Sequence, residues 1–115
     1  MFITLERWEY SPYTKTQNDT LLREDLQPSI VSLNAQHIVS HQKILAHLMV
    51  GGIVDTERAP KPAVLVHMSN GDIHVALDDR GAGRTFREAL DIVASGRNVD
   101  LGESQFTAAR ANALA

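Results

Sequence analysis

The sequence predicts an α+β fold: a small antiparallel sheet of four to five strands, with one main helix packed on it and a short C-terminal helix. Three observations lead to this prediction. Residues 63–77 form two apolar runs around Asn70-Gly71, a dipeptide that tight hairpin turns favour. The side chains of residues 2–9 would alternate for a few positions between the two faces of a strand. Residues 84–95 repeat apolar side chains at helical spacing.

The pattern of the N-terminal part of the chain predicts a strand, a loop and a short helical turn. After the strand at 2–9, residues 10–20 are polar, contain a proline and lack an apolar period, which predicts a loop. Residues 21–26 show a one-turn helical pattern with capping residues just before it. Pro28 ends that turn, because proline disfavours helix in the residue before it.

The segment before Gly51-Gly52 fits either a helix or two strands. Its content of Ile, Val and Ser favours a strand over 30–33, a turn at Asn34-Ala35 and a longer strand over 36–48. The glycine pair ends this element. Residues 55–62 are polar and contain two prolines, which predicts a loop.

The hairpin and the helix after it have the clearest patterns. With Asn70-Gly71 as a two-residue turn, the register places His67 opposite His74. The helix follows a glycine turn and ends at Gly96, a residue that helix C-termini favour. Its apolar face consists of Phe86, Ala89, Leu90 and Val93.

The chain is therefore expected to hold a single α+β domain over residues 1–102. Within it, residues 97–102 are predicted to be a short extended segment. Residues 103–115 are rich in alanine and predict a C-terminal tail or helix.

Composition limits the classes of function. The chain has 115 residues, of which 43% are hydrophobic and 22% charged, as in one ordinary globular domain. Its formal net charge of −3 at pH 7 disfavours a general nucleic-acid coating protein, which is usually basic. The absence of cysteine excludes disulfides, Cys-ligated zinc and cysteine nucleophiles. No apolar run suits a signal sequence or a membrane helix, so we expect a soluble cytoplasmic protein.

Several segments resemble the FlbD/SwrD-like small flagellar motility proteins. The residues that carry the resemblance are Val31-Ser32-Leu33-Asn34, Ile38, the run from Val64 to Val75, and the helix around Phe86, Leu90 and Val93. That family has a similar order of short strand, Leu-Asn pair, second strand, Asn-Gly hairpin and closing helix. This chain departs from the pattern by its greater length, its loop at 50–62 and its tail. The resemblance implies a similar order of elements and no catalytic residues.

Three aromatic residues near the start of the chain are candidates for contact with a partner. Trp8, Tyr10 and Tyr13 lie close together in the sequence, beside the predicted loop. Trp and Tyr are enriched where proteins meet their partners. The competing interpretation places Trp8 in the core with the tyrosines covering it.

A glycine turn that opens the predicted helix suggests an anion site, because backbone N–H groups at a helix N-terminus attract negative charge. The candidates for binding the anion are Arg80, Gly81, Gly83, Arg84 and Arg87. The arginines would also suit a nucleic-acid-binding regulator. Two aspartates just before the turn would repel a phosphate, and the glycine and lysine of a phosphate-binding loop are missing.

The five histidines raise a third hypothesis, a small metal-binding protein or enzyme. His37 and His41 would share one face of a helix, but on a strand they would lie about 13 Å apart, at roughly 3.3 Å per residue. The strand interpretation therefore argues against chelation. The sequence predicts no catalytic residue, metal site or cofactor.

The leading prediction is a non-enzymatic protein-interaction or regulatory module of bacterial or phage type. Its partner would be another protein, and an exposed edge strand would also favour a homodimer. A nucleic-acid regulator that uses the arginine patch and a histidine-based metal protein are the alternatives. No contact with a membrane is expected.

Overall fold

The computed structural model describes residues 1–12, 19–24, 26–50 and 52–114. Its strands are β1 (Phe2–Arg7), β2 (Tyr10–Pro12), β3 (Asp19–Arg23), β4 (Ser29–Asn34), β5 (Ile38–Val50), β6 (Ile53–Val54), β7 (Lys61–Met68), β8 (Ile73–Leu77) and β9 (Val99–Asp100). Two short 3-10 helices, η1 (Ala35–His37) and η2 (Gly81–Gly83), accompany the α-helices α1 (Phe86–Ala94) and α2 (Gln105–Leu114).

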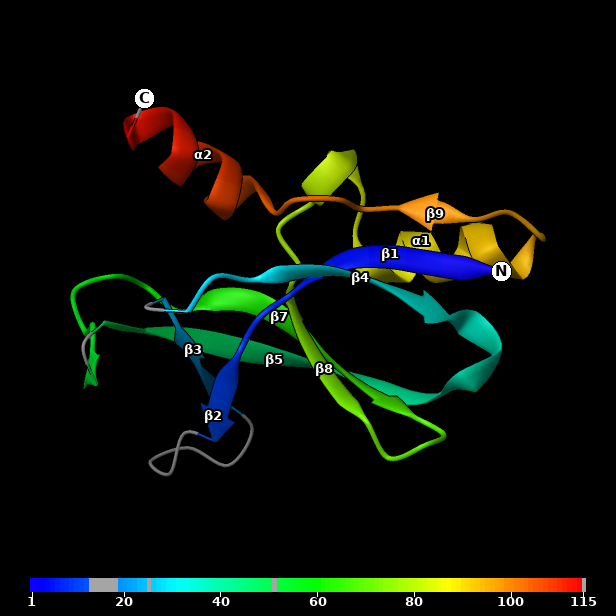
Figure 1. Ribbon diagram of the computed structural model, residues 1–115, viewed down its shortest axis with the longest axis horizontal. Helices are drawn as coiled ribbons and strands as arrows, with labels where there is room; N and C mark the ends of the chain where they lie inside the picture. Colours follow the sequence, from blue (N-terminus) through cyan, green and yellow to red (C-terminus); the bar gives the residue numbers. More distant parts are fainter. Residues whose placement is uncertain (13–18, 25, 51, 115) are drawn as a thin grey trace.

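The strands form two sheets rather than one (Figure 1). The first has the order β4-β1-β9, and the second follows the path β2-β3-β5-β7-β8, with β6 paired to β5. The predicted α+β architecture, a single antiparallel sheet under one main helix, is therefore wrong: the described chain is mostly β. Two of its strand pairs are also parallel, β1 with β9 and β3 with β5.

The strand–turn–strand interpretation of residues 30–48 agrees with the structure. β4 ends at Asn34, whose side chain accepts a hydrogen bond from the backbone N–H of Gln36 and so starts η1. β5 begins directly afterwards. The two strands belong to different sheets, because β4 pairs with β1 whereas β5 pairs with β7 and β3.

The predicted helical turn at 21–26 is wrong, because β3 occupies its first three residues. This strand pairs antiparallel with β2 and parallel with β5. Thr20 and Leu22 are buried on one face, which is the period of a strand. One helical turn is a weak local preference, and pairing on both sides outweighs it. β2 and the start of β3 also fall inside the predicted loop at 10–20, whose residues 13–18 lie outside the described ones.

The β7–β8 hairpin lies where it was predicted, but its register is shifted by one residue. His67 pairs with Ile73, and His74 pairs with Val66, so the predicted His67–His74 pair is wrong. Met68 N–H donates to the carbonyl of Asp72 at 2.8 Å, while the N–H of Gly71 donates back to Met68. Gly71 has a φ of +91°, and a loop of three residues with such a glycine is the next common hairpin turn after the two-residue form.

Both faces of β7 and β8 are buried, each in a different core. One core gathers Ile3 and Leu5 of β1 with Val64, Val66 and Phe86. The other is built on the opposite faces of the same hairpin strands and includes Trp8, Leu22, Ile44, Ala46, Leu48, Ala63 and Val75. Burial on both faces explains why residues 63–66 are continuously apolar instead of alternating.

Candidate functional site

The edge of β4 is the most distinctive exposed backbone in the described part of the chain. β4 is paired on one side only, with β1. None of its six residues, Ser29–Asn34, carries a charge. The other sheet edges are less suited to pairing. β2 has three residues and ends at Pro12, and β9 has two residues and includes Asp100. At β8, the outer edge of the second sheet, the Trp8 N–H already donates to the carbonyl of Val75 at 2.9 Å, and the part of β5 without a β3 neighbour includes Lys43.

Backbone geometry identifies which groups of β4 point away from the sheet. Ala35 N–H donates to the carbonyl of Met1 at 2.9 Å, just beyond the ladder in which Phe2 pairs with Asn34. Hydrogen-bonded and non-bonded pairs alternate along an antiparallel ladder. The odd-numbered residues of β4 therefore bond to β1, and the N–H and C=O groups of Ile30 and Ser32 face outward.

The side chains beside this edge are small or apolar. Ile30 is 56% exposed and Phe2 is 46% exposed. The hydroxyl groups of Ser32 and Thr4 hydrogen bond to each other at 2.8 Å across the β1–β4 pair. Sequence reasoning did not select Ile30 or Ser32. The uncharged run that follows Pro28 was the signal that could have found them.

The aromatic candidates do not form an exposed patch in the described structure. Trp8 is completely buried, and its indole N–H donates to Glu6 at 2.9 Å. Tyr10 is half-buried and packs against the core that holds Trp8. Tyr13 lies outside the described residues. Trp8 is thus a core residue, as the competing interpretation holds, and cannot contact a partner from this position.

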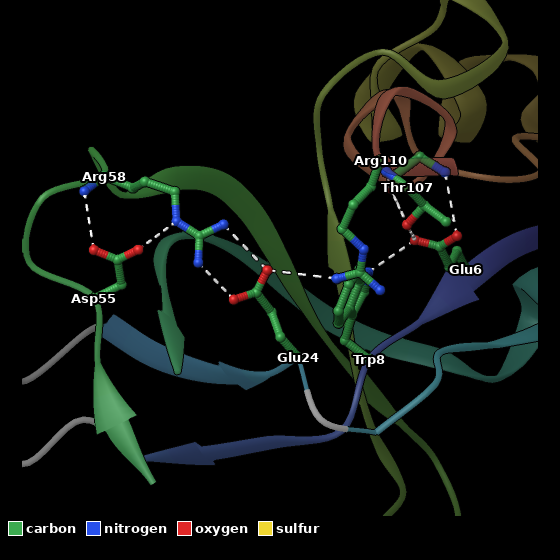
Figure 2. A network of polar contacts seen from close by, with 8 residues as sticks. Glu6, Trp8, Glu24, Asp55, Arg58, Thr107 and Arg110 are labelled. Carbon is green, nitrogen blue, oxygen red and sulfur yellow. Dashed lines mark hydrogen bonds and ion pairs between the residues drawn. The ribbon is translucent and has the colours of Figure 1, made fainter. Parts of the chain in front are cut away.

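A buried carboxylate explains the position of α2 (Figure 2). Glu6 is 5% exposed, and its Oε1 accepts hydrogen bonds from Trp8 and from the hydroxyl groups of Ser104 and Thr107, the last two at 2.8 Å. Ser104 and Thr107 lie at the first turn of α2, where a negative charge is favourable. Phe106 of the same turn packs on Trp8 with 6.1 Å between ring centroids.

A second carboxylate joins three segments that are distant in the sequence. The Glu24 carboxylate accepts two hydrogen bonds from the Arg58 guanidinium and one, at 3.4 Å, from Arg110 of α2. Arg58 also donates to Asp55 at 2.6 Å, as Figure 2 shows. The hydrogen bond with Glu24 raises the pKa of Arg58, and the one from Arg58 lowers the pKa of Asp55.

The first turn of α1, where an anion was expected, already holds protein oxygens. Asp78 accepts from the backbone N–H of Phe86 at 2.9 Å, and the Thr85 hydroxyl accepts from the N–H of Glu88. Asp79 does the same for α2, accepting from the N–H groups of its first two residues. The two adjacent aspartates therefore cap two different helices.

The five residues proposed for the anion are spread over a loop and a helix surface. Arg80 is 3.7 Å from Glu88, whereas Arg84 and Arg87 are exposed. Gly81 faces the backbone, since a Cβ there would lie 2.9 Å from the carbonyl oxygen of Glu103. Gly83 has a φ of +76°. The backbone therefore accounts for both glycines without an anion: Gly81 permits a close approach of two segments, and Gly83 permits a positive φ angle.

The histidines have separate surroundings. His47 bonds Asp19 at 2.9 Å, His37 bonds Ser69 at 3.1 Å, and the ring of His41 lies edge-on to Phe86. Within the described ranges, no three His, Cys, Asp or Glu side chains gather as a metal site would require.

The surroundings of His74 lower its pKa. Burial lowers its pKa from the ordinary value of 6.5, and the positive charge of Arg7 lowers it further. Asp72 acts weakly in the opposite direction. The ring Nδ1 of His74 is buried and has no hydrogen-bond partner. Its environment therefore favours the neutral ring.

A shallow groove of about 500 Å³ lies between η1 and α1. Its lining is Met1, Ala35, Gln36, Leu90, Val93, Ala94 and Gly96. Small-molecule sites combine an apolar wall with a few convergent polar groups. Gln36 provides the single polar side chain of this lining, so the groove has little with which to orient a ligand.

No family model, curated protein or solved structure matches this chain. The similarity to FlbD/SwrD-like proteins therefore stays an expectation from the sequence. In the residues that the structure describes, no helix is long and apolar enough to cross a membrane.

Proposed function

We propose that the protein is a non-enzymatic interaction module of the cytoplasm that receives an extended segment of another polypeptide along β4. The observation that supports this most directly is the six-residue, uncharged edge whose backbone groups at Ile30 and Ser32 face outward. Natural sheets usually protect such edges with charge, proline or a covering segment.

Strand addition suits this edge chemically. An added strand gains affinity from main-chain hydrogen bonds, and the side chains beside the edge select the sequence that binds. Here the neighbours are Ile30, Ser32 and Phe2, which favour an uncharged, partly apolar segment. A basic or acidic ligand would find no opposite charge on β4 itself.

The test is a substitution that blocks the edge and leaves the sheet intact. Ser32→Pro removes the outward N–H and no backbone bond to β1, although it also removes the hydroxyl group that bonds Thr4. Proline is tolerated at strand edges. Ser32→Ala is the matched control, because it removes only the hydroxyl group. Each tagged protein is used to capture partners from lysate of its own host, with and without nuclease.

We expect a stoichiometric protein partner that survives nuclease, is retained by Ser32→Ala and is reduced at least tenfold by Ser32→Pro. Equal capture by both variants would overturn the proposal. Recovery that disappears with nuclease would also overturn it and favour the nucleic-acid alternative, whose affinity should fall steeply with salt.

A further inference from the structure

We infer that the chain that occupies β4 is a second copy of this protein, so that two β4 strands pair antiparallel about a two-fold axis. This inference rests on the proposed function, since it names the partner of the same edge. It joins two three-stranded sheets into one continuous sheet across the dimer.

The alternation along β4 selects one register. The outward N–H groups belong to the even-numbered positions Ile30, Ser32 and Asn34, whereas Pro28, the next even position, has no N–H. Centring the axis on Ser32 places Ile30 opposite Asn34 of the second copy and uses all three donors. Centring it on Val31 would place Asn34 opposite a proline. The Ser32 register therefore forms all of its hydrogen bonds, about six by the antiparallel pattern, between residues of β4 itself, whereas the Val31 register needs Pro28 outside the strand.

Charge favours a second copy over a charged ligand. In a two-fold interface the same patch meets itself, so a net charge on β4 would face the same net charge on the second copy. β4 has none, although the chain as a whole carries −3. The neutral edge is thus compatible with self-pairing, and the exposed Ile30 side chain gains cover from it.

The absence of cysteine makes a single engineered thiol a clean probe of this register. Ser32→Cys would bring two thiols together at the axis, within the Cα separation of 4.4–6.8 Å or so that disulfides require. Ser40→Cys is the matched control, because Ser40 is also an exposed strand serine but lies on β5. The mass in solution is measured by sedimentation from about 1 to 300 µM, a range chosen because interfaces of this small size are weak.

We expect the mass of the wild-type protein to rise with concentration from 12.7 kDa toward twice that value. Ser32→Pro should stay monomeric, and Ser32→Cys should form disulfide dimers at least tenfold faster than Ser40→Cys. Trp8 fluorescence confirms that each variant is folded. A dimer that Ser32→Pro leaves unchanged would overturn the inference.

A wild-type protein that stays monomeric throughout would also overturn self-pairing, and the capture experiment then decides separately about the proposed function. If Ser32→Pro still reduces the capture of another protein, β4 binds a different chain and the proposed function stands. If capture is also insensitive to that substitution, both the inference and the proposed function fail.

Discussion

The cost of burying a polar side chain in this protein depends on the hydrogen-bond partners and charges around it. Glu6 would be costly to bury alone, but it receives hydrogen bonds from Trp8, Ser104 and Thr107. His74 lies in the opposite situation, because its Nδ1 is buried without a partner and Arg7 is nearby. Hydrogen bonds therefore compensate the burial of Glu6, whereas the buried Nδ1 of His74 has no such compensation.

This difference predicts a pH dependence of stability that comes from His74. Because its pKa is lowered in the folded protein, the unfolded chain takes up the proton first as the pH falls. The contribution of His74 to stability is thus complete above its ordinary pKa of 6.5 and is lost as the pH falls below it. We expect the denaturation midpoint of the wild type to drop more than that of His74→Gln from about pH 7.5 to about pH 5.5.

The control for His74 is His37→Gln, a substitution of an exposed histidine. It reports the general effect of replacing a histidine by glutamine outside the β7–β8 hairpin. Identical pH profiles for the wild type and His74→Gln, followed by Trp8 fluorescence during urea denaturation, would contradict this assignment.

Among the elements, the two helices are held by carboxylates from elsewhere in the chain. Asp78 caps α1, while Asp79 and Glu6 lie at the start of α2. The loop between β8 and α1 must then run very close to residues 101–104. Gly81 makes this approach possible, because its Cα lies against the backbone of that segment.

Substitution of the two glycines of this loop should separate close packing from backbone strain. Gly81→Ala would place a Cβ at 2.9 Å from the Glu103 carbonyl oxygen and 3.0 Å from that of Leu101, and backbone cannot move aside as a side chain can. We expect it to lower the free energy of unfolding by about 1–3 kcal/mol.

Gly83→Ala is the matched comparison, because it has open space but a φ of +76°. Strain alone should cost about 1 kcal/mol there. Urea denaturation of both variants provides the measurement. A smaller loss for Gly81→Ala than for Gly83→Ala would show that the close approach is unimportant.

On the scale of the whole molecule, a few side chains join parts of the chain that are far apart in the sequence. The Glu24 carboxylate follows β3, yet it binds Arg58 from the loop before β7 and Arg110 from α2. Its side chain is 8% exposed, whereas each arginine is 38% exposed. The acid is thus shielded, and its partners still meet solvent.

Removal of this shared acid should weaken the protein as a whole. Glu24→Ala removes the acceptor that two guanidinium groups share, and we expect the free energy of unfolding to fall by about 1–3 kcal/mol. The loss should shrink at about 1 M salt, because the arginines are partly exposed. Glu57→Ala, at an exposed acid of the nearby loop, should change stability by less than about 0.5 kcal/mol. Equal effects of the two substitutions in urea denaturation would contradict the joining role of Glu24.

The sequence predicted elements well wherever the pattern was local and long. Four observed elements agree with the prediction: β1 at the N-terminus, β4 and β5 before Gly51-Gly52, and α1 before Gly96. Their side-chain periods reflect one buried face or stripe each. The helical turn predicted over 21–26 failed because its pattern was short and β3 gains hydrogen bonds from two distant strands.

The candidate site was less accessible to sequence reasoning. Trp8 was selected for its residue type, but the position of α2 covers it and makes it part of the core. Ile30 and Ser32 were not selected, because the outward direction of their backbone groups depends on which strand lies beside β4. The uncharged run after Pro28 marks the segment, but which of its backbone groups face outward depends on that pairing.

The sequence by itself determined that this is a cysteine-free, single-domain-sized chain with particular strands and a helix, because composition and short-range periodicity act within a few residues. Only the tertiary structure decided that the strands divide into two sheets, that β7 and β8 are buried on both faces, and that β4 is left at an edge. Those outcomes depend on pairings between residues far apart in the sequence. Such pairings are selected by the packing of the whole molecule, and local preferences do not encode them.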